Sequence, residues 1–255
     1  MMKRSKVLER RIDKAIEKKS NLLNNVDRAD SLKIIPLESR KNPLVLAERL
    51  QIKYDSNAIF NPVSFEVNNG DRVALVGKNG AGKSSILKLI LEKSSTGNEN
   101  ILQPTGNTNN LALVEKAEYT GTLKVANDLK ISYISQSTEY LKGNLKEFAK
   151  KYEVEESIFK AMLVKMGFSN SEFDKDINQM SEGQKKKILI AKSISEQANF
   201  YIWDEPLNYI DILTRIQIEE AILKYKPTLI FVEHDETFIK KISTKVIELK
   251  KNIDI

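Results

Sequence analysis

Residues 77–84 of this 255-residue chain read Gly-Lys-Asn-Gly-Ala-Gly-Lys-Ser, which matches the pattern G-x-x-x-x-G-K-[ST]. The apolar run Val73–Val76 before it predicts a buried strand, and the run Ile86–Leu91 after it predicts a helix. This strand–loop–helix setting is the one in which the pattern binds the phosphates of a nucleotide. The stretch therefore predicts an α/β fold with a phosphate-binding loop.

The residue types of this loop suit ATP, whose phosphates bring a dense negative charge. Glycines let the backbone turn tightly and present N–H groups, and the start of the following helix adds its positive dipole end. We expect Lys83 to reach the β- and γ-phosphates and Ser84 to ligate Mg²⁺. The predicted nucleotide contacts of the loop are Gly77, Asn79, Gly80, Gly82, Lys83, Ser84 and Ser85.

A second apolar run, Phe200–Trp203, ends in the two carboxylates Asp204 and Glu205. In a chain with a phosphate-binding loop, the first carboxylate is placed to hold the Mg²⁺ shell, and the second to act as general base on the attacking water. Taken alone, the run also fits a strand that ends in a solvated acidic turn.

Further short motifs occur in a fixed order along the chain. Met180-Ser181-Glu182-Gly183-Gln184 resembles the Leu-Ser-Gly-Gly-Gln signature of ATP-binding-cassette (ABC) ATPases. Taken singly, each of these motifs has an ordinary structural explanation, such as a capped helix start at Ser181. In family order they are the aromatic Tyr54, the phosphate loop, the Q-loop at Gln136, the signature, Asp204-Glu205, the D-loop over 206–211 and the histidine loop at His234. Residues 44–250 therefore resemble an ABC nucleotide-binding domain.

The resemblance implies roles for the remaining site residues. Tyr54 would stack on adenine, Gln136 would join Ser84 and Asp204 around Mg²⁺ and assist catalysis, and His234 would hold the γ-phosphate. In this family two domains meet head to tail, so Ser181, Gly183 and Gln184 would contact the ATP of another cassette. Glu182 replaces the first glycine of the family signature, and its charge is expected to reduce affinity or turnover.

The same resemblance implies a P-loop NTPase architecture of three parts. A mainly parallel sheet is expected from strands near 72–76, 130–134, 199–203, 228–232 and 245–249. Antiparallel strands near 44–54, 62–67 and 121–126 are expected to form an edge subdomain, and residues 138–180 a helical subdomain. The polar stretch 92–120 is expected to form loops around a small antiparallel sheet, either as a contact surface or as a tolerated insertion.

Residues 1–43 hold 12 Lys and Arg against 6 Asp and Glu, which accounts for the whole net charge of +6. Helical spacing of apolar residues predicts an N-terminal helix over about 5–24, and prolines at 36 and 43 make 25–43 a surface connector before a cassette over 44–255. The helix is either a solvated helix that packs by its apolar stripe or an arm that meets RNA phosphates. A membrane-surface helix is disfavoured because its apolar face lacks aromatic residues.

Residues 61–91 and 202–211 resemble the ABC-F class, whose members carry two cassettes and include proteins that protect ribosomes from antibiotics. The charged helix before this cassette is similar to the end of the linker that joins the two cassettes in that class. The resemblance implies an ATPase that depends on a second cassette, either a copy of this chain or an N-terminal half, and that acts on the ribosome. The alternatives are a soluble subunit of a transporter and an inactive truncated cassette. No apolar run is long enough for a transmembrane segment and the chain has no cysteine, so a cytoplasmic location is expected.

Overall fold

The computed structural model describes residues 31–54, 57–95 and 117–251. The predicted N-terminal helix and most of the polar stretch 92–120 lie outside these ranges. The chain divides into a unit of residues 1–31 and a compact unit of residues 32–255, and the architecture below is that of the second unit.

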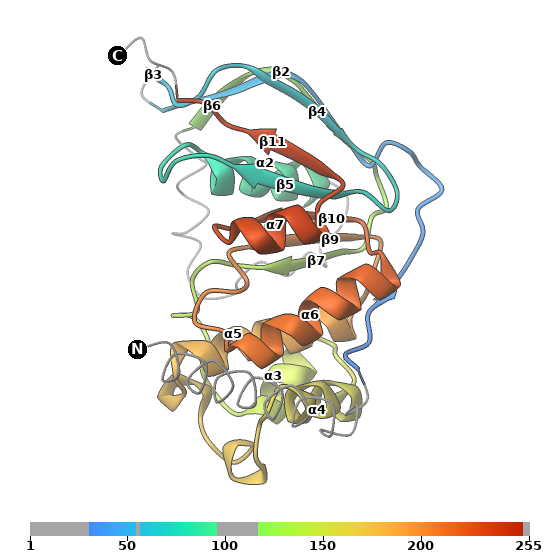
Figure 1. Cartoon of the computed structure of the whole chain (residues 1–255), viewed down its shortest axis with the longest axis vertical. Coiled ribbons are helices and arrows are strands. Elements are labelled where there is room, and N and C mark those ends of the chain that lie inside the picture. Colours follow the sequence, from blue (N-terminus) through green and yellow to red (C-terminus); the bar gives the residue numbers. More distant parts are fainter. Residues whose placement is uncertain (1–30, 55–56, 96–116, 252–255) are drawn as a thin grey trace, which may run out of the picture. The chain divides into compact units, whose positions relative to one another are not determined.

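A five-stranded parallel sheet forms the centre of this unit, in the order β11-β5-β10-β9-β7 (Figure 1). Its strands are β5 (Arg72–Val76), β7 (Ile131–Ile134), β9 (Phe200–Asp204), β10 (Leu229–Val232) and β11 (Lys245–Glu248). β9 and β10 are buried at every position, which explains why they read as continuous apolar runs in the sequence. The predicted parallel sheet is confirmed.

Side chains alternate between two hydrophobic cores, one on each face of this sheet. In β9, Tyr201 and Trp203 belong to one core and Phe200 and Ile202 to the other. The first core also contains the apolar faces of α5 (Glu182–Ser195) and α6 (Ile212–Tyr225), and the second contains that of α2 (Lys83–Ser95). This alternation of period two is the property of an extended strand that lets one sheet hold two layers.

The predicted antiparallel sheet covers the α2 side. Its central strand, β2 (Val45–Tyr54), pairs with β4 (Val63–Val67), with β6 (Ala117–Val125) and with the short β3 (Asn57–Ala58). The register of β2 shifts between residues 47 and 51, where Arg49 adopts a positive φ of 49°. Such a bulge bends a strand and increases its twist.

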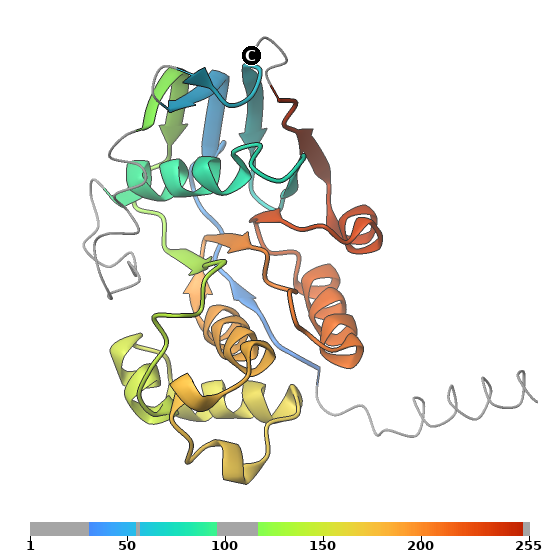
Figure 2. The ribbon, with the colours of Figure 1, turned by 90° about the vertical axis from the view of Figure 1, so that its left-hand side faces the viewer.

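The helical subdomain lies at the end opposite the antiparallel sheet (Figure 2). It contains α3 (Leu145–Lys151), α4 (Glu156–Lys165) and the two 3-10 turns Asn170–Glu172 and Ile177–Gln179, which lead into α5. α7 (Glu236–Ile242) follows β10 and completes the helices of the described residues. None of the helices in these ranges combines the length and hydropathy needed to cross a bilayer.

Residues 32–36 correct the expectation of a surface connector over 25–43. Leu32 and Ile34 are fully buried in the helical-side core. β1 (Ile35–Pro36) pairs in parallel with β8 (Gln197–Ala198), directly after α5. Burial of two branched apolar side chains is worth several kcal/mol in total, by the usual value of about 1.5–3 kcal/mol each, and it outweighs the breaking effect expected of Pro36.

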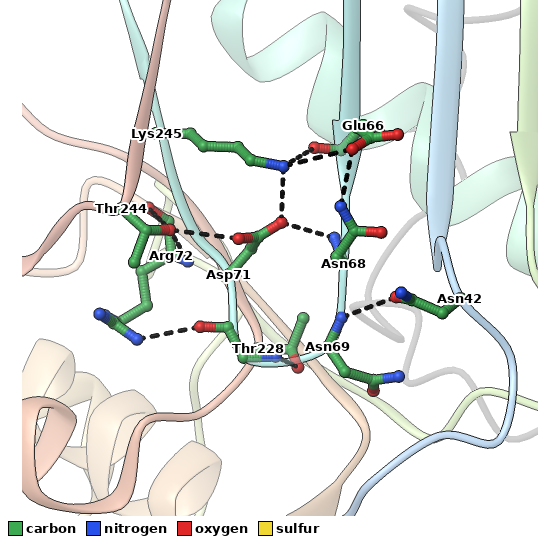
Figure 3. A network of polar contacts seen from close by, with 10 residues as sticks. Asn42, Glu66, Asn68, Asn69, Asp71, Arg72, Thr228, Thr244 and Lys245 are labelled. Atoms are coloured by element: carbon green, nitrogen blue, oxygen red, sulfur yellow. Dashed lines mark hydrogen bonds and ion pairs between the residues drawn. The ribbon is translucent and has the colours of Figure 1, made fainter.

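A polar network joins the two larger sheets at the turn between β4 and β5 (Figure 3). Oδ2 of Asp71 accepts the backbone N–H of Asn68 at 2.7 Å and lies 2.8 Å from Nζ of Lys245 on β11. Burial raises the pKa of Asp71, but these hydrogen bonds outweigh it and the pKa is lowered. The network fixes the beginning of β5, whose other end opens the phosphate loop.

Candidate nucleotide-binding site

The phosphate loop leaves the carboxyl end of β5 and enters α2. The Lys83 side chain lies over the loop and is buried, and its Nζ donates to the carbonyls of Gly77 at 2.8 Å and Lys78 at 3.2 Å. Burial lowers the pKa of Lys83, and the charges of Glu205 and Asp204 oppose that effect. The ammonium group is therefore held on the loop, within the electrostatic influence of the two carboxylates at the end of β9.

The backbone of this loop fits a phosphate chain. A Cβ at Gly77 would lie 2.7 Å from the Leu249 carbonyl, and one at Gly82, whose φ is +86°, would lie 2.5 Å from the Ile59 side chain. Within the described ranges, no hydrogen-bond acceptor is present for the N–H groups of Asn79, Gly80 and Gly82. Unpaired N–H groups in the loop that leads into a helix are the usual donors to phosphate oxygens.

Asp204 and Ser84 lie together and could hold a magnesium ion through their side-chain oxygens. The Ser84 hydroxyl donates to Oδ1 of Asp204 at 3.0 Å, and Asp204 as a residue is 1% exposed. Burial raises the pKa of Asp204, and the bond from Ser84 acts against that rise. No group of three His, Cys, Asp or Glu side chains suited to a metal occurs in the described part of the chain. The Asp204 carboxylate and the Ser84 hydroxyl fit Mg²⁺, which binds through one or two carboxylates together with substrate phosphates and water.

The carboxylate of Glu205 is the meeting point of three other side chains. Its Oε2 accepts from Nε2 of Gln136 at 3.0 Å and from Nδ2 of Asn208 at 2.7 Å, and its Oε1 lies 3.2 Å from Nε2 of His234. Glu205 has a φ of +49°, a left-handed conformation that a non-glycine residue adopts only when its surroundings impose it. The turn after β9 therefore brings this carboxylate to Asn208 of the same turn and to one residue from each of the loops after β7 and β10.

Two other predicted site residues lie as follows. The Tyr54 hydroxyl at the end of β2 is 3.1 Å from Oγ of Ser85 on α2, which places this ring beside the phosphate loop. Gln136 contacts Glu205 and has no hydrogen bond to Ser84 or Asp204 within the described residues.

The signature residues begin α5. The Ser181 side chain accepts the N–H of Gln184 at 3.2 Å, and the Gln184 side chain accepts the N–H of Ser181 at 2.9 Å, which forms a capping box. Gln184 also donates to Glu172, so its side chain is engaged within the helical subdomain. No hydrogen bond or ion pair joins residues 181–184 to residues 77–85 in the described chain.

The Glu182 side chain is turned toward the segment after β7. Its carboxylate accepts a short hydrogen bond from Oγ1 of Thr138 and lies 3.0 Å from Nζ of Lys185. The hydrogen bond from Thr138 lowers the pKa of Glu182, and the bond from Lys185 adds to that effect. The expectation that this charge reduces affinity or turnover stays a prediction, and both partners of the carboxylate belong to this chain.

Sequence reasoning missed two residues that hold the site together. Glu233 is buried; its carboxylate accepts the N–H of Leu207 at 2.8 Å and that of His234 at 3.2 Å, and burial raises its pKa. Arg215 donates to the carbonyls of Leu207 at 3.0 Å and Ile210 at 3.2 Å. A glutamate directly after the apolar run of β10 was a usable signal, whereas nothing in the local sequence singles out Arg215.

Comparison with known proteins gives consistent results. The ABC transporter family model matches residues 60–208. ABC transporter F family member 2 of Arabidopsis thaliana is 32% identical over 209 residues, which cover 81% of this chain and 28% of that protein. ATP-binding protein Uup of Buchnera aphidicola is 26% identical over 220 residues, which cover 82% of this chain and 33% of the relative. The chain thus spans about a third of the length of the relatives it matches.

A solved structure of RNase-L Inhibitor shares the fold. It superposes with a TM-score of 0.60 at 24% identity and covers 84% of this chain and 38% of the other. ATP binding and hydrolysis are the general activity of domains with this fold and these motifs. The matched residues include the phosphate loop, the signature, and the carboxylates Asp204 and Glu205. The chain belongs to the ABC transporter family, as an ATP-binding domain whose relatives are of the ABC-F type.

Proposed function

We propose that this chain is one cassette of an ABC-F-type ATPase, that it hydrolyses ATP when it pairs with a second cassette, and that it acts on the ribosome. The observation that carries the catalytic part is the gathering of Gln136, Asn208 and His234 around Glu205, next to the Ser84–Asp204 pair. A carboxylate so oriented is suited to accept a proton from water.

Each residue has a defined task in this proposal. Lys83 and the N–H groups of the loop hold the phosphates, and Tyr54 lies beside adenine. Ser84 and Asp204 would hold Mg²⁺, and Gln136 would join them when the nucleotide is bound; the ion would offset charge on the phosphate oxygens. Glu205 accepts the proton of the attacking water, and His234 orients the γ-phosphate and that water.

The second cassette is needed because the signature lies apart from the phosphate loop of its own chain. Ser181, Gly183 and Gln184 would contact the ATP held by the other cassette, and the other signature would close this site. ATP then stabilises the paired state, and loss of the γ-phosphate contacts releases it. The partner is a second copy of this chain or a cassette elsewhere in a longer chain.

Ribosome binding is supported by two observations. The relatives include an ABC transporter F family member, and the net positive charge of the chain lies in residues 1–43. Clustered Lys and Arg neutralise RNA phosphates in a salt-dependent manner. The proposal places the protein in the cytoplasm, in translation or in resistance to antibiotics that bind ribosomes.

The variant Glu205→Gln tests this proposal, because it keeps the size of the side chain and removes the base. MgATP binding should stay within about threefold of the wild type, while turnover should fall by about a hundredfold or more, the usual worth of a general base. The trapped variant should sediment with ribosomes only when MgATP is present. The double variant Lys83→Ala/Glu205→Gln, which cannot hold the phosphates, is the control.

Other outcomes separate the alternatives. Wild-type turnover by Glu205→Gln would remove Glu205 from the mechanism. ATP-dependent association with membranes instead of ribosomes would indicate a transporter subunit. Absence of both, together with no turnover by the wild type, would indicate an inactive cassette.

A further inference from the structure

Two contacts join the first turns of α5 to the four residues that follow β7. Nζ of Lys186 donates to the backbone carbonyl of Ser135 at 3.0 Å. Oγ1 of Thr138 donates to the carboxylate of Glu182. The two contacts therefore hold a segment of residues 135–138, here called the Q-segment, at both of its ends.

Between these two points stands Gln136, whose Nε2 donates to Oε2 of Glu205 at 3.0 Å. The amide side chain is exposed, while Ser135 and Thr138 on either side are buried. An exposed side chain keeps one orientation only when its backbone is fixed. The contacts to Glu182 and Lys186 supply that fixation.

Helix geometry brings the two α5 residues to the same task. Glu182 and Lys186 are four positions apart, so they lie on one face of the helix. Ser181 caps the same turn, and Gly183 lies within it. The face that holds the Q-segment and the proposed surface for a second cassette are thus parts of one rigid helix start.

Lys186 is unusual for its burial. The residue is 2% exposed, and a buried ammonium group is unfavourable unless it is hydrogen-bonded and compensated. The carboxylates of Asp204, Glu205 and Glu233 act electrostatically on it, with Glu182 as the fourth. Burial lowers the pKa of Lys186 and these charges oppose the change. The ammonium group of Lys186 thus provides a buried positive charge that compensates the acidic groups of the site.

We propose that Glu182 and Lys186 are positioning residues that clamp the Q-segment, so that Gln136 is held on Glu205 before nucleotide binds and turns to Mg²⁺ and the γ-phosphate afterwards. This inference rests on the proposed function. It gives the glutamate that replaces a signature glycine a task inside its own chain. It also provides a physical route by which a nucleotide at Gln136 can shift the start of α5, which carries Ser181 and Gly183.

The variant Lys186→Met tests the clamp, because it keeps the length of the side chain and removes the ammonium group. Thr138→Val removes the other contact with little change of shape. Lys192→Met is the matched control, because Lys192 is also a lysine of α5 and is 3% exposed. Its Nζ lies 2.9 Å from the carboxylate of Glu196, outside the proposed site. A purely structural role of buried lysines would give Lys186→Met and Lys192→Met the same phenotype.

Two measurements on the full chain are made for each folded variant. Amide hydrogen exchange of residues 135–139 should become at least tenfold faster in Lys186→Met and at least threefold faster in Thr138→Val, and should not change in Lys192→Met. The ratio of the dissociation constants for MgADP and MgATP should fall at least threefold in Lys186→Met. In a Gln136→Ala background the same substitution should change that ratio by less than twofold, because the effect passes through Gln136.

The clamp would be overturned if residues 135–139 of folded Lys186→Met exchange their amide hydrogens at the wild-type rate. It would also be overturned if Lys186→Met changes the ratio of dissociation constants as much in the Gln136→Ala background as in the wild type. If Lys186→Met does not fold, Thr138→Val carries the same two tests with the same criteria. Failure of the wild type to bind MgATP would refute the proposed function separately, since the exchange comparison is made without nucleotide.

Discussion

The hydroxyl oxygen of Ser84 lies 3.0 Å from Oδ1 of Asp204, although 120 positions separate the two residues in the chain. The parallel order of β5, β10 and β9 produces this proximity, because the carboxyl ends of parallel strands meet at one edge of a sheet. A cation held there would have one oxygen from the residue that ends the phosphate loop and one from the end of β9, which β10 separates from β5.

The first prediction concerns the magnesium dependence of ATP binding. Asp204→Asn should weaken ATP binding by about 10- to 100-fold when Mg²⁺ is present, since a hydrogen bond or contact to a charged group is worth about 1.5–3 kcal/mol. In EDTA the variant and the wild type should bind alike. Titration calorimetry in both buffers measures the difference. Asp71→Asn, at the other end of β5, is the control and should keep the wild-type response to Mg²⁺.

The second prediction concerns the close approach of the signature to the D-loop. A Cβ at Gly183 would lie 2.6 Å from the backbone carbonyl oxygen of Tyr209. Gly183→Ala should therefore destabilise the protein by about 1–3 kcal/mol, the usual effect of overpacking, although alanine has the better helix propensity by about 1 kcal/mol. Urea unfolding measures the change.

On the same helix, Ser195→Ala is the matched comparison. The Ser195 hydroxyl is buried without a hydrogen-bond partner among the described residues, so its removal should be neutral or stabilising. If Gly183→Ala is as stable as the wild type, the close approach does not constrain this glycine.

The third prediction concerns Arg215, which ties the D-loop to the start of α7. Its guanidinium donates to the carbonyls of Leu207 and Ile210 and to Oδ2 of Asp235. Lysine cannot reproduce this fork, so Arg215→Lys should lower the free energy of unfolding by about 1–2 kcal/mol. Arg40→Lys, at an exposed site, should stay within about 0.5 kcal/mol of the wild type. Equal stability of the two variants would contradict this role.

The fourth prediction concerns pH. Burial acts to raise the pKa of Asp211, but the hydrogen bonds from Lys187 and Thr214 outweigh it and lower the pKa to about 2. The folded pKa lies below the unfolded one, so the stabilisation is present above about pH 4 and is lost as the pH falls toward 2. The Asp211 side chain is 50% exposed, and solvent screening reduces the expected contribution to about 1 kcal/mol.

Asp211→Asn isolates this charge, because asparagine caps α6 as well as aspartate does. The wild type should exceed the variant in unfolding free energy at pH 7, and the difference should shrink as the pH is lowered through 4 to 2. A difference that stays constant over that range would show that the ionised carboxylate has no such effect. Lys240→Met removes an exposed ion pair on α7 and should show almost no difference at either pH.

Local patterns explain why much of the fold was predictable. Arg72–Val76 and Phe200–Asp204 are short apolar runs whose ends carry the loop and the carboxylates, so strand and site residue appear together in the sequence. The pair β1 and β8 has only two residues in each strand, which is too short for a periodic pattern. Leu32 and Ile34 are buried in a core formed by residues far away in the sequence, which local patterns do not reveal.

The site residues likewise divide into those in local motifs and those brought together by packing. The phosphate loop is contiguous, so the spacing of its residues in the sequence is enough to identify them. The bond from Asn208 to Glu205 depends on the conformation of the turn after β9, where Glu205 has a positive φ. The bond from Lys186 to Ser135 depends on how α5 packs against β7. Such contacts between distant segments form only when the chain packs, so the spacing of residues along the sequence does not reveal them.

The pairing of β1 with β8 attaches the segment around Ile35 next to the C-terminal end of α5. α5 has 14 residues, which at 1.5 Å per residue makes it about 21 Å long, with Ser181 at its head and β8 just beyond its tail. Leu32, Ile34 and β1 are therefore fixed to the compact unit just beyond the C-terminal end of α5. The segment that leads into the cassette is thus anchored at the end of the helix opposite to Ser181.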